Sequence, residues 1–262
     1  MSSSRPRRTA VPVRAAAVAG AVAVLLAGAT ACGASAEDDS DPEHRTFPVA
    51  GGTLTVDSDD STLEIIAADS NAAGKVEVTR WFQGSVVVGS DPKVTWSMTG
   101  DRLKLRVKCS GMVANCAAKH RIEVPRGITV KVEEGDGSVR ARGFEDPLEI
   151  STGDGSVDVT DSTGPLTVRT GDGSIHADVT SREIRAQTGD GSVDLALGAV
   201  PDLVDSRTGD GSVTIALPAA TYRVTTQTGD GSVNVSVPRA ESSAHVVNAR
   251  TGDGKVTVRT AN

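Results

Sequence analysis

The sequence is poor in aromatic residues, with two Trp, one Tyr and three Phe among its 262 residues. Aromatic side chains supply much of the buried volume of an ordinary large core. A chain that is 38% hydrophobic without them must build its core from Val, Ile, Leu, Thr and Ala. This scarcity argues against ordinary α/β enzymes and large β-sandwiches, and it favours a thin, repetitive β architecture.

Excess positive charge is also lacking, because the formal net charge is −7. Nucleic-acid binding needs a basic surface that neutralises phosphates, so a nucleic-acid partner is not expected. The sequence shows no Ser-His-Asp set, phosphate loop or zinc-ligand spacing. Its four histidines share no local spacing, and they are His44, His120, His176 and His245. We therefore expect a protein that is not an enzyme and that needs no cofactor.

Residues 1–31 have the layout of a secretory signal peptide. Four arginines and no acidic residue occur in 1–14, and 15–31 is small or apolar apart from Thr30. The segment ends Leu-Leu-Ala-Gly-Ala-Thr-Ala-Cys, which resembles a bacterial lipobox, so we predict lipidation at Cys32. A simple cleaved signal and an uncleaved anchor are the alternatives, although this apolar stretch barely spans a bilayer. The pair Arg7-Arg8 leaves the export route open between the general and the twin-arginine pathway.

Loss of 1–31 would remove four positive charges and lower the formal net charge from −7 to −11. Residues 32–45 are small and acidic without hydrophobic periodicity, so we expect the lipidated Cys32 followed by a solvated tether. The protein would then be anchored to the outer face of the bacterial cell membrane.

Cysteine usage agrees with export. Besides Cys32 there are only Cys109 and Cys116. An even pair in an oxidising compartment predicts a disulfide. The alternative, a two-thiol metal or redox site, lacks further cysteines or nearby histidines.

A repeated turn dominates the second half of the chain. Gly-Asp-Gly-Ser occurs six times and Gly-Asp-Gly-Lys once, in steps of 18, 18, 18, 20, 20 and 23 residues. The turns begin at Gly135, Gly153, Gly171, Gly189, Gly209, Gly229 and Gly252. A period near 20 residues is typical of a solenoid.

Apolar and polar residues alternate on both sides of each turn, as in 166–170 and 175–179. Such alternation predicts strands with one buried face. Insertions fall only in the second connection, at 198–203 and 238–244. We expect an all-β solenoid with coils of 18–23 residues over 135–262. Residues 46–134 would form opening coils and an irregular N-terminal cap, with strands at 53–56, 63–66, 75–78, 103–107 and 122–124.

The turn residues suggest their own roles. Gly adopts the positive φ expected at a sharp corner, and it also permits close approach of the next coil. Asp and Ser can accept hydrogen bonds from nearby backbone N–H groups. Lys255 and Arg259 are expected to protect the last exposed strand from edge-to-edge association.

The run Ile-Glu-Val-Pro-Arg-Gly-Ile-Thr-Val at 122–130, followed by serial Leu-x-Val-x-Thr-Gly-Asp-Gly-Ser-Val units, resembles the bacterial putative-adhesin β-helix family. This is a family of unknown function, and the resemblance covers about 46–260. It implies a right-handed single-stranded β-helix on exported or membrane-tethered proteins. The family has no established catalytic residues, so none can be transferred to this chain.

The seven turn aspartates should stack along one corner of the solenoid. They are Asp136, Asp154, Asp172, Asp190, Asp210, Asp230 and Asp253. Carboxylates on coils about 4.8 Å apart repel by roughly 1 kcal/mol per pair in water. Backbone hydrogen bonds and the arginines Arg169, Arg207 and Arg250 are expected to offset this repulsion. The alternative is Ca²⁺ held between adjacent carboxylates at Asp154, Asp172 and Asp190.

The sequence therefore favours a lipid-anchored extracytoplasmic β-helix that acts as a scaffold, adhesin-like protein or envelope-associated binding module. Its expected partners are the membrane, through the lipid, and a cell-envelope protein or carbohydrate. A Ca²⁺-binding surface β-roll is one alternative. A polysaccharide-active β-helix enzyme is another, but a catalytic site would interrupt a repeat rather than recur in seven turns.

Overall fold

The computed structural model describes residues 35–69, 74–112 and 114–261. The signal peptide predicted for 1–31 and the lipidation predicted at Cys32 lie outside the described residues. Contacts group 33–262 into one compact unit, which is almost entirely β-structure. The described residues contain a single short 3₁₀ helix, η1 (Ala36–Asp38). Among the described residues, no helix is long and apolar enough to cross a membrane.

Two sheets form the unit. The 11-stranded sheet contains, in spatial order, β1 (Glu43–Pro48), β4 (Lys75–Val86), β7 (Ala114–Pro125), β3 (Thr62–Ala68), β9 (Val139–Arg142), β11 (Val157–Thr160), β13 (Ile175–Val179), β15 (Val193–Leu197), β17 (Val213–Leu217), β21 (Lys255–Thr260) and β19 (Ser232–Val235). The 10-stranded sheet contains β18 (Arg223–Gln227), β20 (Val246–Thr251), β16 (Leu203–Thr208), β14 (Glu183–Gln187), β12 (Leu166–Thr170), β10 (Leu148–Thr152), β8 (Thr129–Glu134), β2 (Thr53–Ser58), β6 (Arg102–Lys108) and β5 (Lys93–Thr99).

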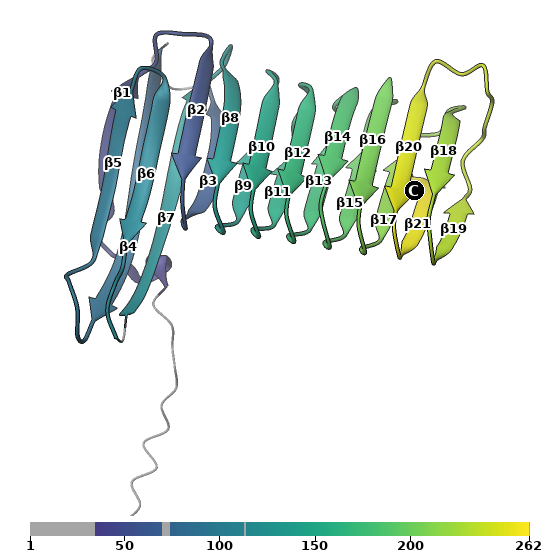
Figure 1. The fold of residues 1–262 in the computed structure, drawn as a ribbon. Helices are drawn as coiled ribbons and strands as arrows, with labels where there is room; N and C mark the ends of the chain where they lie inside the picture. Colours follow the sequence, from purple (N-terminus) through teal and green to yellow (C-terminus); the bar gives the residue numbers. More distant parts are fainter. Residues whose placement is uncertain (1–34, 70–73, 113, 262) are drawn as a thin grey trace, which may run out of the picture. The chain divides into compact units, whose positions relative to one another are not determined.

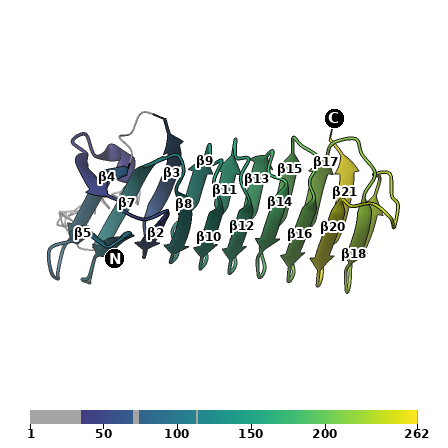
Figure 2. The same ribbon diagram turned by 90° about the horizontal axis from the view of Figure 1, so that it is seen from above.

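From β8 to β17, consecutive strands alternate between the sheets, so each coil adds one strand to each sheet (Figure 1, Figure 2). Pairing here is parallel, and Leu148 lies beside Leu166 while Val157 lies beside Ile175. Every second residue of these strands is buried between the sheets. The predicted all-β solenoid architecture is therefore confirmed.

The core consists mainly of Val, Ile, Leu and Ala, as the composition predicts. Small side chains such as Ala186, Ser206 and Ala249 occupy the middle inward position of their strands and are buried. Larger rings lie mostly towards the ends of the solenoid, where Trp96 and Tyr222 are buried. This distribution follows from coil stacking, because a coil covered on both sides leaves little room for a ring.

At the C-terminal end, the order of coils in space differs from their order in sequence. The coil β20–β21 lies between β16–β17 and β18–β19. The chain passes from β17 to the outermost coil and then returns through residues 236–245. Because β21 pairs with β17 on one side and with β19 on the other, the prediction that Lys255 and Arg259 protect an edge strand is wrong. The edge strands at this end are β18 and β19.

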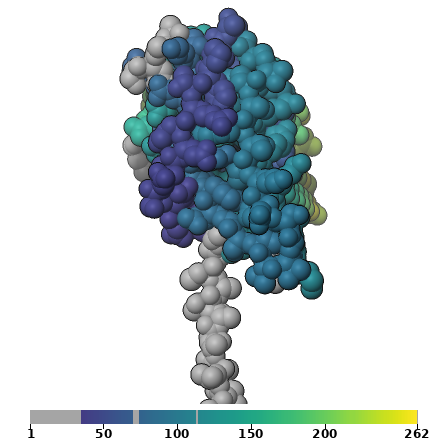
Figure 3. All heavy atoms as spheres, turned by 90° about the vertical axis from the view of Figure 1, so that its left-hand side faces the viewer, coloured from purple at the N-terminus to yellow at the C-terminus, as the bar shows by residue number. Residues whose placement is uncertain are grey.

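The N-terminal end shows a similar crossing. The coil β2–β3 pairs with β8–β9 on its inner side and with β6 and β7 on its outer side. Beyond β6 and β7, the antiparallel strands β5, β4 and β1 extend both sheets. Figure 3, which faces this end, shows it covered by residues coloured purple to blue. All five strands expected in 46–134 are present, as parts of β2, β3, β4, β6 and β7.

The expected solvated tether is shorter than 32–45. Ala36 is buried, and Glu43 begins β1, which pairs antiparallel with β4. Asp39 accepts a hydrogen bond from the backbone N–H of Phe82 at 2.9 Å. The acidic composition of this segment does not indicate that its backbone and carboxylates have hydrogen-bond partners on neighbouring strands.

Candidate functional site

The Gly-Asp-Gly turns stack at one corner through their backbones. The N–H of Gly171 donates to the carbonyl of Gly153 at 2.5 Å, and the N–H of Gly189 donates to that of Gly171 at the same distance. A Cβ added to Gly191 would lie 2.2 Å from the carbonyl oxygen of Gly173. None of the turn glycines has a positive φ, so that expectation is wrong. Glycine is required here because stacked backbones approach too closely for any side chain.

A threonine precedes six of the seven turns, and its contact with the adjacent coil was not predicted from the sequence. The hydroxyl of Thr188 lies 3.1 Å from the carbonyl oxygen of Gly171 and 2.8 Å from that of Gly173. The same contact recurs for Thr152, Thr170, Thr208, Thr228 and Thr251. The hydroxyls thus donate to turn carbonyls of the adjacent coil. The recurrence of Thr immediately before Gly-Asp-Gly was the available signal.

Glu134 takes the place of this threonine in the first regular coil, where it pairs in register with Thr152. The side chain is buried, and its Oε1 accepts from the N–H of Ser61 at 3.1 Å. Burial raises the pKa of Glu134 to about 7, against the opposing effect of hydrogen bonds from Ser58, Ser61 and Gly137. The sequence offered no signal for this carboxyl, because Glu is ordinarily exposed.

All seven turn aspartates are exposed, and Asp253 precedes Asp230 in the spatial order of the coils. Asp253 also accepts a hydrogen bond from the N–H of Asp230 at 3.3 Å. Arg169 and Arg207 do not offset these charges. They form ion pairs with Glu149 and Asp205 instead. In the described part of the chain, no turn aspartate forms an ion pair with an arginine.

The calcium alternative at Asp154, Asp172 and Asp190 has no assembled ligand set. Across residues 35–69, 74–112 and 114–261, no group of three or more His, Cys, Asp or Glu side chains is placed to hold a metal ion. Each coil contributes one carboxylate to an exposed rim. Ca²⁺ binding therefore stays a prediction to be tested.

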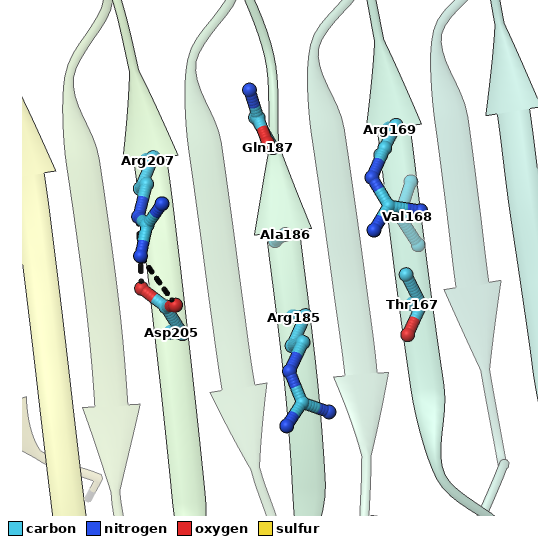
Figure 4. A pocket seen from close by; sticks show the side chains of 8 residues that line it. All are labelled: Thr167, Val168, Arg169, Arg185, Ala186, Gln187, Asp205 and Arg207. Carbon is cyan, nitrogen blue, oxygen red and sulfur yellow. Dashed lines mark hydrogen bonds and ion pairs between the residues drawn. The ribbon is translucent and has the colours of Figure 1, made fainter.

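The outer face of the 10-stranded sheet presents a row of arginines and amides. Arg169, Gln187, Arg207 and Arg250 lie in register on β12, β14, β16 and β20. Figure 4 shows Arg169, Arg185 and Arg207 on three neighbouring strands around a shallow cavity of about 110 Å³. We call the surface formed by Arg169, Arg185, Gln187, Arg207 and Arg250 the arginine face. Its guanidinium groups suit recognition of carboxylates or phosphates.

The outer face of the 11-stranded sheet differs in charge. Arg140, Asp158, His176 and Asp194 lie in register on β9, β11, β13 and β15. His176 is exposed, as expected for an outward strand position. The solenoid thus presents two long faces of different chemistry. One has several arginines, three of them paired with acidic neighbours, and the other has an arginine, a histidine and two aspartates in register.

The N-terminal end contains a disulfide, a buried tryptophan in contact with two arginines, and a buried histidine. Cys109 and Cys116 form a disulfide with their Cα atoms 6.2 Å apart. The guanidinium of Arg80 lies 4.6 Å from the centre of the buried Trp96 ring, and that of Arg45 lies 5.0 Å from it. His120 is fully buried nearby, and neither ring nitrogen has a hydrogen-bond partner among the described residues. Burial, with the charge of Arg80 adding to it, lowers the pKa of His120 to about 3.

Several solved structures are similar to this chain at low sequence identity. A putative adhesin from Bacteroides fragilis NCTC 9343 is 14% identical with a TM-score of 0.51, over 85% of this chain and 98% of that one. A putative cell adhesion protein from Clostridium sporogenes ATCC 15579 is 15% identical with a TM-score of 0.37, over 84% and 100%. A putative lipid binding protein from Parabacteroides distasonis ATCC 8503 is 12% identical with a TM-score of 0.47, over 85% and 98%.

No relative was found among curated proteins. The model of the family described as Toastrack DUF4097 matches residues 33–262, which include every described residue. The repeated turns, the parallel two-sheet solenoid and this match together show that the chain belongs to the Toastrack DUF4097 family.

Proposed function

We propose that the protein is a non-catalytic binding module, anchored by lipid at Cys32 to the outer face of the bacterial cell membrane. The observation that carries the binding role is the arginine face. Several guanidinium groups lie in register there on strands that the turn contacts hold in place. Rigid display of several weak contacts suits a repetitive partner better than a single small ligand.

The partner that fits the arginine face is an acidic polymer or protein of the cell envelope. Arg169 and Arg207 already pair with Glu149 and Asp205, at 3.3 and 2.9 Å. The arginine side chains of both pairs are about half exposed, at 51% and 50%, and solvent weakens such pairs, so a ligand carboxylate or phosphate can replace them at little cost. The name of the similar solved structure from Bacteroides fragilis, a putative adhesin, agrees with a surface location and a binding role. We also propose that the solenoid is right-handed and that its coils contain 18–23 residues, as the sequence analysis predicts.

The binding role is tested with purified acidic cell-envelope polysaccharide and the triple variant Arg169→Ser/Arg185→Ser/Arg207→Ser. Binding to an immobilised polymer should weaken at least about tenfold, because three charge-assisted contacts are lost. The matched control is Arg140→Ser/Arg142→Ser/Arg259→Ser on the opposite sheet, which removes the same charge and should change binding little. Equal losses in both variants would show only a general charge effect. Turnover of the polymer would support the enzyme alternative instead.

Lipid anchoring has a separate test. The Cys32→Ala variant should leave the membrane fraction and appear in the medium or soluble extracytoplasmic fraction. Absence of a lipid on Cys32 of the wild-type protein, measured by mass spectrometry, would contradict the lipid anchor.

Calcium binding can be examined on the same protein. Millimolar Ca²⁺ should raise the melting temperature, and EDTA should reverse the rise, if the turn aspartates hold the ion. An unchanged melting temperature would remove this alternative.

A further inference from the structure

Exposed apolar side chains gather at one point of the molecule. Among the described residues, four large hydrophobic side chains are exposed, and three of them are Val87, Val88 and Met112, at 73%, 57% and 84%. All three lie where the β4–β5 connection meets the β6–β7 connection. We call residues 86–93 and 108–112 the tip. The fourth, Val233, lies in edge strand β19 at the opposite end of the solenoid, at 45%.

Several contacts hold the tip in one conformation. The N–H of Met112 donates to the carbonyl of Val88 at 2.8 Å, and the N–H of Ser90 donates to that of Ser110 at 3.3 Å. Gly89 and Gly111 form an antiparallel bridge. The Cys109–Cys116 disulfide closes the β6–β7 connection. The apolar side chains are therefore presented by a cross-linked structure, which suggests that the surface has a partner.

The start of the described chain lies on the strands that lead to the tip. Besides the contact of Asp39 with the backbone of Phe82 on β4, Glu37 pairs with Lys119 on β7 at 3.2 Å. Phe82 precedes Val87 by five residues, or about 17 Å along a strand. Figure 1 shows η1 near the lower ends of β4 and β7, where the tip lies. Cys32 precedes Ser35 by three residues, which span at most about 11 Å.

The charge of the tip suits a membrane surface. Lys93 and Lys108 lie opposite each other on β5 and β6, while Asp91 is the only acidic residue of the tip. The tip is thus net positive on a chain whose formal net charge is −7. Apolar side chains flanked by lysines match the boundary between the acyl chains and the anionic headgroups of a bilayer.

We propose that the tip enters the headgroup region of the bilayer to which the protein is anchored, as a second membrane contact beside the lipid. This inference rests on the proposed lipid anchor at Cys32. The two contacts together fix the orientation of the solenoid on the membrane, so that the arginine face projects sideways into the envelope instead of rotating freely.

The test places a Trp at the tip, in Val87→Trp, and at the far end of the solenoid, in the matched control Val233→Trp. The lipidated proteins are reconstituted on vesicles of phosphatidylcholine with one part in about four of phosphatidylglycerol, with or without brominated acyl chains. Bromine should quench the additional fluorescence of Val87→Trp at least about twofold and leave that of Val233→Trp unchanged. Equal fluorescence of Val87→Trp on both vesicles would overturn the proposal.

A second measurement separates this proposal from the lipid anchor. In the Cys32→Ala background, vesicle sedimentation should show weak binding that Val87→Asp/Met112→Asp reduces about tenfold and Val233→Asp does not. Absence of lipid on Cys32 with tip-dependent sedimentation would refute the anchor alone. Lipidation without quenching or tip-dependent sedimentation would refute the tip contact alone. A tip variant that changes only the oligomeric state would assign the surface to a second copy of the chain and also overturn the proposal.

Discussion

The regular coils, from β8 to β17, and the N-terminal end, from η1 to β7, are parts of the same two sheets but are stabilised in different ways. Each regular coil after the first repeats the same backbone and threonine contacts with its neighbour. At the N-terminal end each contact occurs once, as in the cation–π contacts of Arg45 and Arg80 with the Trp96 ring or the burial of His120. A covered coil can use small side chains, whereas the N-terminal end, which no further coil covers, is closed by rings, antiparallel strands and a disulfide.

The largest expected effect is the loss of folding stability in acid that the buried His120 of the N-terminal end causes. The pKa of His120 is about 3 when folded and near 6.5 when unfolded, so the unfolded chain takes up a proton first as the pH falls. Stability that is present above pH 6.5 should be lost towards pH 3, by roughly 4 kcal/mol. His120→Phe should remove this loss. Urea unfolding at a series of pH values measures it.

The control for this prediction is His176→Gln, because His176 is exposed on the regular coils. Its variant should lose stability in acid as the wild type does. An acid loss of unchanged size in His120→Phe would show that His120 is not its cause.

Close packing of the regular turns is tested by Gly191→Ala. The added Cβ would lie 2.2 Å from the carbonyl oxygen of Gly173, so one of two paired backbones must move. We expect a loss of about 3 kcal/mol in the free energy of unfolding. Gly52→Ala at the N-terminal end, where no atom lies within 4 Å of the new Cβ, should change stability by less than about 0.5 kcal/mol. Similar losses in both variants would contradict the close-approach explanation.

The junction between the two regions is tested by Glu134→Gln. Because the folded pKa of about 7 exceeds the usual 4.5, stability present below pH 4.5 is lost as the pH rises towards 7. The variant should match the wild type near pH 4 and exceed its unfolding free energy by up to about 3 kcal/mol at pH 8. The exposed neighbour Glu133 provides the control, since Glu133→Gln should change stability by less than about 1 kcal/mol at either pH.

The smallest expected effect concerns the threonine contacts. Thr188→Val keeps the shape of the side chain but removes the hydroxyl that lies 2.8 Å from the carbonyl of Gly173. Thermal or urea unfolding should show a loss of about 1 kcal/mol. Thr225→Val on the exposed edge strand β18 should be neutral within about 0.5 kcal/mol. A neutral Thr188→Val would leave the backbone bonds as the main contacts between coils.

The sequence predicted the regular coils well because their contacts have a local signature. Alternation over 166–170 and 175–179 placed the buried faces correctly, and the turns marked the corner. The burial of His120 and Glu134 was not predicted, because it has no local signature in the sequence. Each is an isolated polar residue that is usually exposed, and its burial depends on strands far away in the sequence, such as β3 and β4 for His120.

The sequence by itself determined the all-β repeat, the stacked corner and the pairing of Cys109 with Cys116, because these depend on period and composition. Only the tertiary structure decided the order of the outer coils, since a parallel strand pairs with whichever neighbour fits it and not with the next one along the chain. Tertiary structure also decided why the turns contain glycine. A side chain at these positions would clash with the carbonyl oxygen of the adjacent coil. This clash cannot be recognised from the sequence of a single coil.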